Sequence, residues 1–315
     1  MEIEQELAEI APQGETFLAI GVFDGVHAGH RYLLGKLKQR AIEENLLSVV
    51  VTFNPHPQSV LRPQNHVLWL SDVKDRVKSI KELGIDIVVV LSFTPEVSRL
   101  SAREFISILK KHLRMRGMIV GPDFVLGQGR EGNIDLIRSL GQEMEFTVEI
   151  LSPFIIDGEA VSSTLIRQAL AQGDMRKAEK LMGHHFHLKD KVTTSDKRGQ
   201  GIGFPTANLD VKPQQAIPGN GVYATITYVN GKQFPSATNI GTRPTFGNGR
   251  NIVETHLIGY KDDLYDKEIK VEFVQKLRDE QHFTSSQELT AQIRKDIQEV
   301  KTILSQQEEI LNSRH

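Results

Sequence analysis

The sequence contains no cysteine among its 315 residues. This absence excludes disulfide bonds, zinc sites built from thiolates and catalysis by a cysteine nucleophile. It also fits a protein of a reducing compartment, and we therefore expect a cytoplasmic location.

An excess of positive charge and long apolar runs are absent too. Lys and Arg number 38 against 40 Asp and Glu, which gives a formal net charge of −2 at pH 7. A protein with this balance has no overall positive field to attract nucleic acid or an acidic membrane surface. The first residues, MEIEQELAEI, lack the basic start of a secretory signal, and no segment reaches the ~18 apolar residues that a membrane span needs. We expect a soluble protein with neither nucleic acid nor a membrane as partner.

Length and rhythm divide the chain into two domains. A chain of 315 residues exceeds the roughly 250–300 residues at which a single hydrophobic core stops growing. Between residues 16 and 151, short apolar runs alternate with amphipathic helical stretches, which predicts a doubly wound α/β domain with a parallel sheet. The expected strands are TFLAIGV from Thr16, LLSVVVTF from Leu46, DIVVVLSF from Asp86, GMIVG from Gly117 and FTVEIL from Phe146.

After about residue 160 the pattern changes. VSSTLIRQALAQGD and MRKAEKLMG predict two helices, and strand-like segments separated by Gly, Pro and Asn follow as far as about residue 274. The pair Asn230-Gly231 predicts a tight hairpin, and the last ~30 residues predict an amphipathic helix. We expect a small β-barrel with a terminal helix and place the boundary between domains 1–183 and 184–315. The histidines near this boundary are interpreted as part of a polar linker rather than a metal site; they are His184, His185 and His187.

The most informative residues follow the first expected strand, in GVFDGVHAGH. Gly25 and Gly29 permit a tight turn and a close approach of the backbone to a ligand. The helix expected from Arg31 directs its first amides and its dipole toward this turn, which favours an anion. His27 and His30 are three residues apart, so both imidazoles can face one side of the first helical turn. The pattern predicts a phosphate site with two imidazole donors.

No activated nucleophile accompanies this turn, so positioning and charge stabilisation would carry a direct attack on a phosphoryl group. On these residues alone, two alternatives stay open. One is a capped helix with two surface histidines, and the other is a zinc site, although no convincing third ligand is near. A G-x-G-x-x-G pattern also occurs, but it does not join a strand to a helix, so we interpret it as a loop; its glycines are Gly127, Gly129 and Gly132.

Four segments in a fixed order decide between these readings. GVFDGVHAGH resembles the HxGH signature of the nucleotidyltransferase superfamily. TFNPHPQSVL from Thr52, GPDFVLGQGREGN from Gly121 and VSSTLIRQAL from Val161 resemble segments of bacterial FAD synthetases. The resemblance implies a Rossmann-like domain.

The resemblance also implies roles for single residues of this domain. His27 and His30 would contact the phosphates of ATP and stabilise the transition state, and Arg167 would counter phosphate charge. Nucleotide or flavin would be bound by a wider set: Gly21, Phe23, Asp24, Gly25, Asn54, His56, Asp123, Ser162, Ser163 and Thr164.

The second informative segment is GIGFPTANLD, from Gly201 to Asp210. Thr206 and Asn208 supply oxygen ligands in a turn that Pro205 fixes, and Gly203 leaves room for a phosphate. Hard oxygen donors suit Mg²⁺, which keeps several waters and shares ATP phosphates. A plain loop before a strand stays open on these residues alone.

The same segment resembles the Gly-x-Pro-Thr-Ala-Asn hallmark of riboflavin kinases. PGNGVYATI from Pro218, ATNIGTRPTF from Ala237 and VETHLI from Val253 continue in the order of that family. Together with its first domain, the chain resembles the bacterial bifunctional riboflavin kinase/FAD synthetases. The resemblance implies ATP, riboflavin, FMN and FAD as substrates and products, with Mg²⁺ at both sites.

In this resemblance, Thr206 and Asn208 bind Mg-ATP, and Glu254 is the general base that activates the ribityl hydroxyl. A base is chemically sensible because a primary alcohol attacks poorly until its proton has an acceptor. Arg278 would hold phosphate or flavin, with a surface ion pair as the alternative. Gly203 and Pro205 complete the expected binding set.

Three positions depart from the family pattern. Pro122 offers no backbone N–H where the family often has another residue, Gln200 stands where an Arg is common, and Gly259 stands where an Asp is common. These departures leave open a protein whose kinase half is impaired. A flavin-binding regulator and an enzyme that adenylylates another small phosphate are further alternatives.

Overall fold

The structure is a computed structural model that describes residues 2–64, 67–193, 203–242 and 251–312. The chain divides into two compact units, Met1–Ser163 and Thr164–His315. Within the described ranges, no helix combines the length and the apolar character that crossing a bilayer requires.

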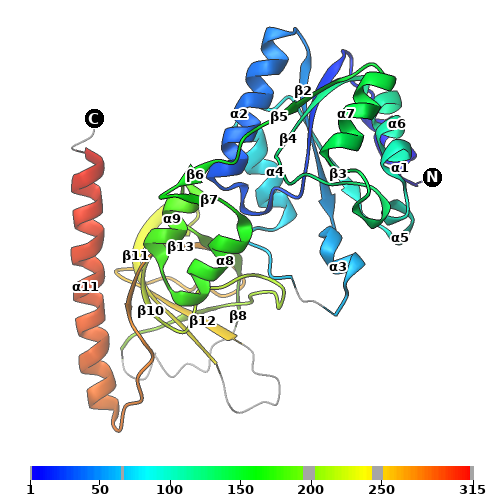
Figure 1. Cartoon of the computed structure of the whole chain (residues 1–315). Helices are drawn as coiled ribbons and strands as arrows, with labels where there is room; N and C mark the ends of the chain where they lie inside the picture. The colour runs from blue at the N-terminus through cyan, green and yellow to red at the C-terminus, as the bar shows by residue number, and fades with distance from the viewer. Residues whose placement is uncertain (1, 65–66, 194–202, 243–250, 313–315) are drawn as a thin grey trace. The chain divides into compact units, whose positions relative to one another are not determined.

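The first unit is built on a five-stranded parallel sheet, as the alternating sequence predicts. The strand order is β3-β2-β1-β4-β5, so the chain winds outward from the central strand in both directions (Figure 1). The central strand is entirely buried, which explains its unbroken apolar sequence. The strands are β1 Thr16–Ile20, β2 Leu47–Asn54, β3 Ile87–Ser92, β4 Met115–Val120 and β5 Thr147–Ile150.

Helices cover both faces of this sheet, as Figure 1 shows. On one face, Leu18 and Val49 belong to a core with Leu7 of α1 and Leu109 of α6; on the other face, core residues of α2 and α4 pack against the sheet. The helices are α1 Glu2–Ile10, α2 Ala28–Glu43, α3 Pro57–Leu61, α4 Val73–Glu82, α5 Pro95–Ser98, α6 Ala102–Leu113 and α7 Ile134–Glu143. Short 3₁₀ turns, η1 Asp24–Val26 and η2 Gln128–Arg130, and a small ribbon, β6 Ile155–Ile156 with β7 Glu159–Ala160, complete the unit.

The second unit is a closed six-stranded barrel in the order β10-β11-β12-β9-β8-β13. Asn230 and Gly231 have φ of 49° and 77° and join β10 to β11, which confirms the predicted tight hairpin. The strands are β8 His187–Thr193, β9 Ala207–Leu209, β10 Gly221–Val229, β11 Lys232–Thr242, β12 Asn251–Leu257 and β13 Glu268–Arg278. The helices are α8 Ser163–Gln172, α9 Met175–Met182 and α11 Ser286–Asn312.

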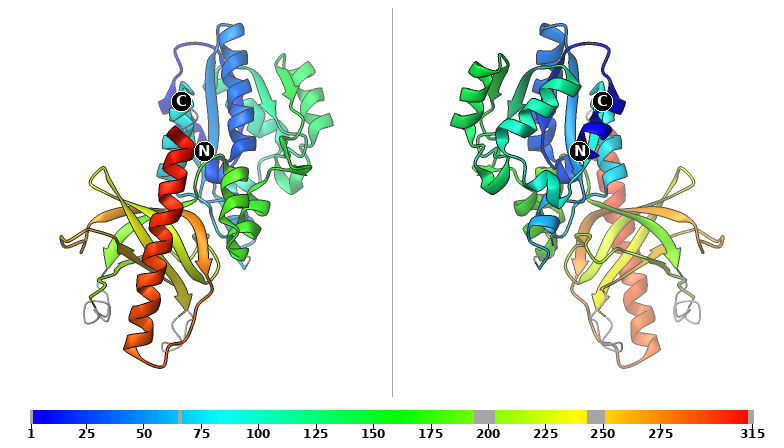
Figure 2. Two further views of the ribbon diagram at one scale, coloured as in Figure 1. Left: turned by 90° about the vertical axis from the view of Figure 1, so that its left-hand side faces the viewer. Right: turned by 90° about the vertical axis from the view of Figure 1, so that its right-hand side faces the viewer.

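The barrel has an apolar outer face under the terminal helix and a hydroxyl-rich interior. Ala224 of β10 belongs to a cluster with Val300 and Leu304 of α11, and Figure 2 shows this helix running along the outside of the strands. Since neighbouring residues in a strand point to opposite faces, Thr225 points inward. The interior hydroxyls are fully buried and hydrogen-bonded to one another; they are Thr225, Thr227, Ser236, Thr238 and Thr255.

Candidate functional site

A tight turn directly follows β1 and is locked by the segment before α4. Phe23 and Gly25 have φ of 52° and 77°. Gly25 therefore adopts a left-handed conformation in this turn, as a glycine can without strain. The Asp24 carboxylate is buried and accepts hydrogen bonds from the backbone N–H groups of Leu70 (2.8 Å) and Ser71 (3.2 Å). Glycine 25 donates its N–H to the Ser71 hydroxyl at 3.0 Å. The turn is therefore held rigidly where a ligand phosphate is expected.

His27 and His30 meet at the start of α2, which begins at Ala28, three residues earlier than the sequence suggested. Their rings stack with centroids 3.5 Å apart and an interplanar angle of 16°. His27 caps the helix because its Nδ1 accepts the backbone N–H of His30 at 3.3 Å. An Nδ1 that accepts cannot carry the proton of a neutral imidazole, so in neutral His27 the proton is on Nε2.

The His30 ring is held in its neutral form. Burial lowers the pKa of His30 well below its usual value, and the charges of His27 and Arg76 lower it further. The edge of Phe23 packs against the same ring at 5.2 Å between centroids. The buried Nδ1 of His30 has no hydrogen-bond partner among the described residues, an exception among buried polar atoms that marks this ring as a candidate site residue.

The segment resembling Ser-Ser-Thr-x-Ile-Arg contacts this turn at Ser163. The Ser163 hydroxyl donates to the carbonyl oxygen of Asp24 at 3.1 Å, although 139 residues separate them in the chain. Ser162 is exposed. Thr164 and Arg167 belong to α8 in the second unit, so their assignment to this site stays a prediction.

The remaining residues predicted for the first site lie at the end of a strand or in the loops. Asn54 is the last residue of β2, and His56 caps α3 by accepting the N–H of Gln58 at 3.1 Å. Asp123 is exposed in the turn after β4. Gly21 follows β1 and donates its N–H to the Val51 carbonyl oxygen at 3.0 Å. Ligand contacts for these residues stay predictions.

Arg76 of α4 was not predicted and is one of the most buried charged groups in the described chain. Its side chain is 6 % exposed, and its NH1 group donates to the Val22 carbonyl oxygen at 2.6 Å. A signal was present in the sequence, because Arg76 lies four residues before Ile80 on the buried face of an amphipathic helix.

In the second unit, three polar residues form a row across neighbouring strands of the barrel. Asn208 of β9 and Asn239 of β11 are both paired directly with Glu254 of β12, one on each side. Directly opposed residues place their side chains on the same face of a sheet, here the outer face of the barrel. Asn208 is 8 % exposed, and its Oδ1 atom has no hydrogen-bond partner among the described residues. A buried amide oxygen without a partner beside a carboxylate is an exception among buried polar atoms, and a role for it in binding a cation stays a prediction.

The Pro-Thr-Ala-Asn turn is tied to β12 by a histidine that sequence reasoning did not single out. The Nδ1 of His256 donates to the Pro205 carbonyl oxygen at 2.8 Å, and the edge of its ring packs against Phe204 at 5.6 Å. The period of two in Glu-x-His could have indicated it, since residues 254 and 256 share one face. Gly203 has φ of 87°, and no heavy atom of the described residues lies within 4 Å of the place where a Cβ would be. That this space admits a ligand phosphate stays a prediction.

A cavity of about 730 Å³ opens beside this turn. Thr206 lines it on one side, and the loop between β12 and β13 lines it on the other. The lining residues are Val192, Thr193, Pro205, Thr206, Ala207, Thr255, Leu257, Tyr260, Lys261, Asp262, Asp263, Leu264 and Tyr265. Its size and mixed walls suit a small polar ligand with an aromatic part.

Arg278 forms an ion pair with Asp296 of α11. Its Nε and NH2 groups donate to both carboxylate oxygens of the buried Asp296, at 3.0 and 2.8 Å in the shortest contacts. This bidentate pair attaches the end of β13 to the terminal helix. A role for Arg278 in binding phosphate or flavin stays a prediction.

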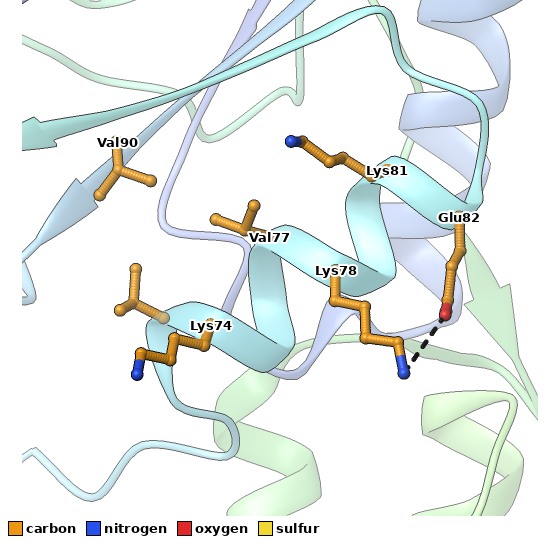
Figure 3. A pocket seen from close by; sticks show the side chains of 7 residues that line it. Lys74, Val77, Lys78, Lys81, Glu82 and Val90 are labelled. Carbon is orange, nitrogen blue, oxygen red and sulfur yellow. Dashed lines mark ion pairs between the residues drawn. The ribbon is translucent and has the colours of Figure 1, made fainter.

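One further hollow of the first unit holds none of the predicted site residues. A groove of about 690 Å³ is lined by residues of α4 and by Val90 of the edge strand β3. Figure 3 shows the side chains that line it, with Val77 on the helix and Val90 on the strand. Three lysines line it, and Lys78 pairs with Glu82 at 3.8 Å. Within the described residues, no group of three or more His, Cys, Asp or Glu side chains is arranged to hold a metal ion.

Comparison with known proteins assigns each half of the chain to a family. The FAD synthetase family model matches residues 9–165, and the riboflavin kinase family model matches residues 182–304. A bifunctional riboflavin kinase/FMN adenylyltransferase from Escherichia coli (strain K12) is 40% identical over 288 residues, covering 91% of this chain and 92% of that protein. The protein of the same name from Pseudomonas fluorescens is 37% identical over 300 residues, covering 94% of this chain and 96% of that protein.

Among solved structures, a crystal structure described as a macrolide-efflux protein from Streptococcus pneumoniae aligns with a TM-score of 0.87 and 25% identity. It covers 96% of this chain and 97% of its own. The two family models in order, and relatives at 40% identity over nine tenths of both sequences, lead to one conclusion. The chain belongs to the family of bifunctional riboflavin kinase/FMN adenylyltransferases.

Proposed function

We propose that the chain makes FAD from riboflavin in two ATP-dependent steps, with the residues of each unit in the roles given below. The second unit transfers the γ-phosphate of ATP to riboflavin, which gives FMN and ADP. The first unit transfers AMP from a second ATP to FMN, which gives FAD and pyrophosphate. The observation that carries the proposal is that each family-matched segment assembles its own cluster of polar groups, His27 with His30 and Asn208 with Glu254.

For adenylyl transfer, the stacked histidines act as donors and not as nucleophiles. The FMN phosphate oxygen attacks the α-phosphorus of ATP, and the bond to the β-phosphate oxygen breaks as pyrophosphate leaves. Negative charge accumulates on the phosphoryl oxygens, where the Nε2–H of His27 and a ring N–H of His30 would donate. Preorganised donors in a partly buried site stabilise such charge without reorganisation at the moment of reaction. Ser162, Ser163 and Arg167 are proposed to bind phosphate at the same site.

For the kinase step, Glu254 accepts the proton of the ribityl hydroxyl as its oxygen attacks the γ-phosphorus of ATP. Thr206 and Asn208 are proposed to hold Mg-ATP, since the unpartnered Oδ1 of Asn208 and a threonine hydroxyl are the hard oxygen donors that Mg²⁺ accepts. The cation would neutralise phosphate charge when bound with ATP. The cavity beside Thr206 is proposed for the nucleoside part of ATP, with Tyr260 and Tyr265 as its aromatic walls.

The departures from the family pattern do not remove any of these groups. Gly259 has φ of 82°, a backbone conformation that glycine adopts without strain at the turn after β12. Gln200 lies outside the described residues. The boundary at 183/184 also remains a proposal, because residues 166–181 fall between the two family models and α8 and α9 group with the barrel.

A reciprocal pair of variants tests the assignment. His30→Ala should lower FAD formation from FMN by about 10²–10³-fold, the usual effect of removing one donor to a developing oxyanion, and should leave FMN formation from riboflavin intact. Glu254→Gln should abolish FMN formation and leave FAD formation from added FMN intact, because glutamine cannot accept the proton. The measurement is chromatography of the products after incubation with ATP, Mg²⁺ and either riboflavin or FMN.

A matched control is Glu268→Gln, which alters an exposed carboxylate on the barrel that pairs with Lys189 at 3.0 Å. This variant should keep both activities. Equal loss of both activities in His30→Ala or in Glu254→Gln would contradict the assignment of one reaction to each unit.

A further inference from the structure

We call the segment from Phe23 to His30 the histidine turn. Arg76 places a buried positive charge beside this turn in the first unit. Most buried charged groups are paired or hydrogen-bonded, because moving an ion out of water is unfavourable. The guanidinium of Arg76 donates to neutral acceptors, and its Nε has no hydrogen-bond partner among the described residues. Burial lowers the pKa of Arg76, and the carboxylates of Asp24 and Asp72 oppose that shift, so the cation is kept.

The contacts of Arg76 join the ends of two neighbouring strands. Its NH1 group donates to the carbonyl oxygen of Val22 at 2.6 Å, to the hydroxyl of Thr52 at 3.2 Å and to the carbonyl oxygen of Phe53 at 3.4 Å. The Thr52 hydroxyl in turn donates to the Val22 carbonyl oxygen at 3.0 Å. Val22 directly precedes the histidine turn, and Phe53 directly precedes Asn54. A single nitrogen thus fixes the starting points of two loops at the carboxyl end of the sheet, where ligands bind in such folds.

The segment that carries Arg76 holds the same turn at two more points. Leu70 and Ser71 bind the Asp24 carboxylate, and the Ser71 hydroxyl accepts the N–H of Gly25. The 70–76 segment therefore constrains the turn through backbone and side-chain hydrogen bonds on either side of Phe23. Groups that assist a reaction must be held within about 0.5 Å of their working geometry, and hydrogen bonds of this kind provide such support.

We propose that Arg76 is a positioning residue for adenylyl transfer, which aligns the His27–His30 turn with the end of β2 so that donors and attacking phosphate meet in one geometry. It acts through Val22, Thr52 and Phe53 and does not itself touch the reacting atoms. This inference rests on the FMN adenylyltransferase reaction proposed for the first unit.

The test compares Arg76→Gln, Arg76→Lys and Thr52→Val in the full chain, with ATP and FMN varied separately. Arg76→Gln removes the cation and should lower kcat for FAD formation by about 10²-fold, the cost of misplacing groups by about an ångström. The KM values for ATP and FMN should change by less than about threefold, because a lost alignment affects the transition state more than the bound ground state. Arg76→Lys keeps the charge without the planar fork and should recover part of kcat.

Three controls separate the possible outcomes. Lys78→Gln alters an exposed residue of the same helix and should match the unaltered chain. FMN formation from riboflavin should stay constant in every variant, because it belongs to the second unit. The fluorescence of Trp69, the one tryptophan of the sequence, reports whether the first unit remains folded.

Thr52→Val removes a single hydroxyl from the contacts of Arg76 and should also lower kcat, by a smaller factor than Arg76→Gln.

A normal kcat in Arg76→Gln overturns the proposal, and so does a raised KM for ATP at unchanged kcat, which would make Arg76 a ground-state binding residue. If Arg76→Gln does not fold, normal kcat values in both Arg76→Lys and Thr52→Val overturn it as well. Failure of the unaltered chain to form FAD from FMN would instead refute the proposed function.

Discussion

His30 couples the stability of the first unit to pH. Burial, His27 and Arg76 together lower the pKa of His30 well below the value near 6.5 that it has in an unfolded chain. Between these two values, the unfolded chain binds a proton that the folded chain does not, so the free energy of unfolding falls as pH drops through 6.5 toward the lowered pKa. Above pH 6.5, both states are neutral at this site and the effect vanishes.

Replacing His30 by Asn should therefore make the first unit less sensitive to acid. The fall in its free energy of unfolding between pH 7.5 and pH 5 should be smaller in His30→Asn than in the unaltered chain, because asparagine does not titrate. The measurement is urea denaturation followed by Trp69 fluorescence at both pH values. Identical acid-induced losses in the two proteins would mean that His30 is readily protonated in the folded state.

Site residues that belong to a short sequence motif could be predicted from the sequence. Residues whose partners lie far away in the sequence could not. The pairing of His27 with His30 follows from helical spacing, and their rings do stack. Arg76 binds Val22 across 54 residues of sequence, and Asp296 binds Arg278 from another element, so neither contact has a local signature. Only the fold brings such pairs together.

Among the elements, the barrel strands carry an unusual polar interior that stabilises the second unit. Thr238 lies at its centre, with its hydroxyl 2.9 Å from that of Thr255 and 2.7 Å from that of Thr225. Valine has nearly the same shape but no hydroxyl. Thr225 would keep its bonds to Ser236, whereas the buried Thr255 hydroxyl would keep, among the described residues, the 3.5 Å contact with Thr227. An unsatisfied buried polar group costs about 1–3 kcal/mol.

Thr238→Val should thus destabilise the barrel by about 1–3 kcal/mol without changing FAD formation from FMN. The measurement is the urea concentration at which FMN formation is lost, since this activity reports on the second unit. Thr302→Val, at an exposed position of α11, is the matched control and should stay within about 0.5 kcal/mol. An unshifted midpoint for Thr238→Val would show that its neighbours re-pair.

The elements themselves were predictable where their own sequence is periodic. The five parallel strands, the Asn-Gly hairpin and the terminal helix all occur where apolar alternation and turn residues indicated them. Helix α1 was missed because its stability comes from tertiary contacts: Ile3 and Leu7 are 2 % and 0 % exposed, and Glu6 accepts the N–H of Ser92. Strand β9 has three residues, too few for any period to be read.

At the scale of the whole molecule, the two reactions share FMN, which is the product of one and a substrate of the other. The proposed groups of the kinase site lie within the second unit, and the stacked histidines lie within the first. A chain that has lost one activity should therefore be complemented by a chain that has lost the other.

An equimolar mixture of His30→Ala and Glu254→Gln should form FAD from riboflavin, whereas each variant alone should not. The first variant supplies FMN, and the second converts it once FMN has left the first protein. The measurement is chromatographic detection of FAD over time, with the unaltered chain at the same concentration as reference. Accumulation of FMN without FAD in the mixture would point to a product that does not leave the chain that made it.

The pairing of Glu254 with Asn208 also limits how this protein can change by insertion and deletion. Val253 and Thr255, on either side of Glu254, are 1 % and 0 % exposed and face the barrel interior. Loss or gain of one residue within β12 would turn the carboxylate into the buried hydroxyls and bring an interior side chain out in its place. Length variants in natural or engineered descendants should therefore be confined to the connecting loops, whereas point substitutions accumulate in the strands.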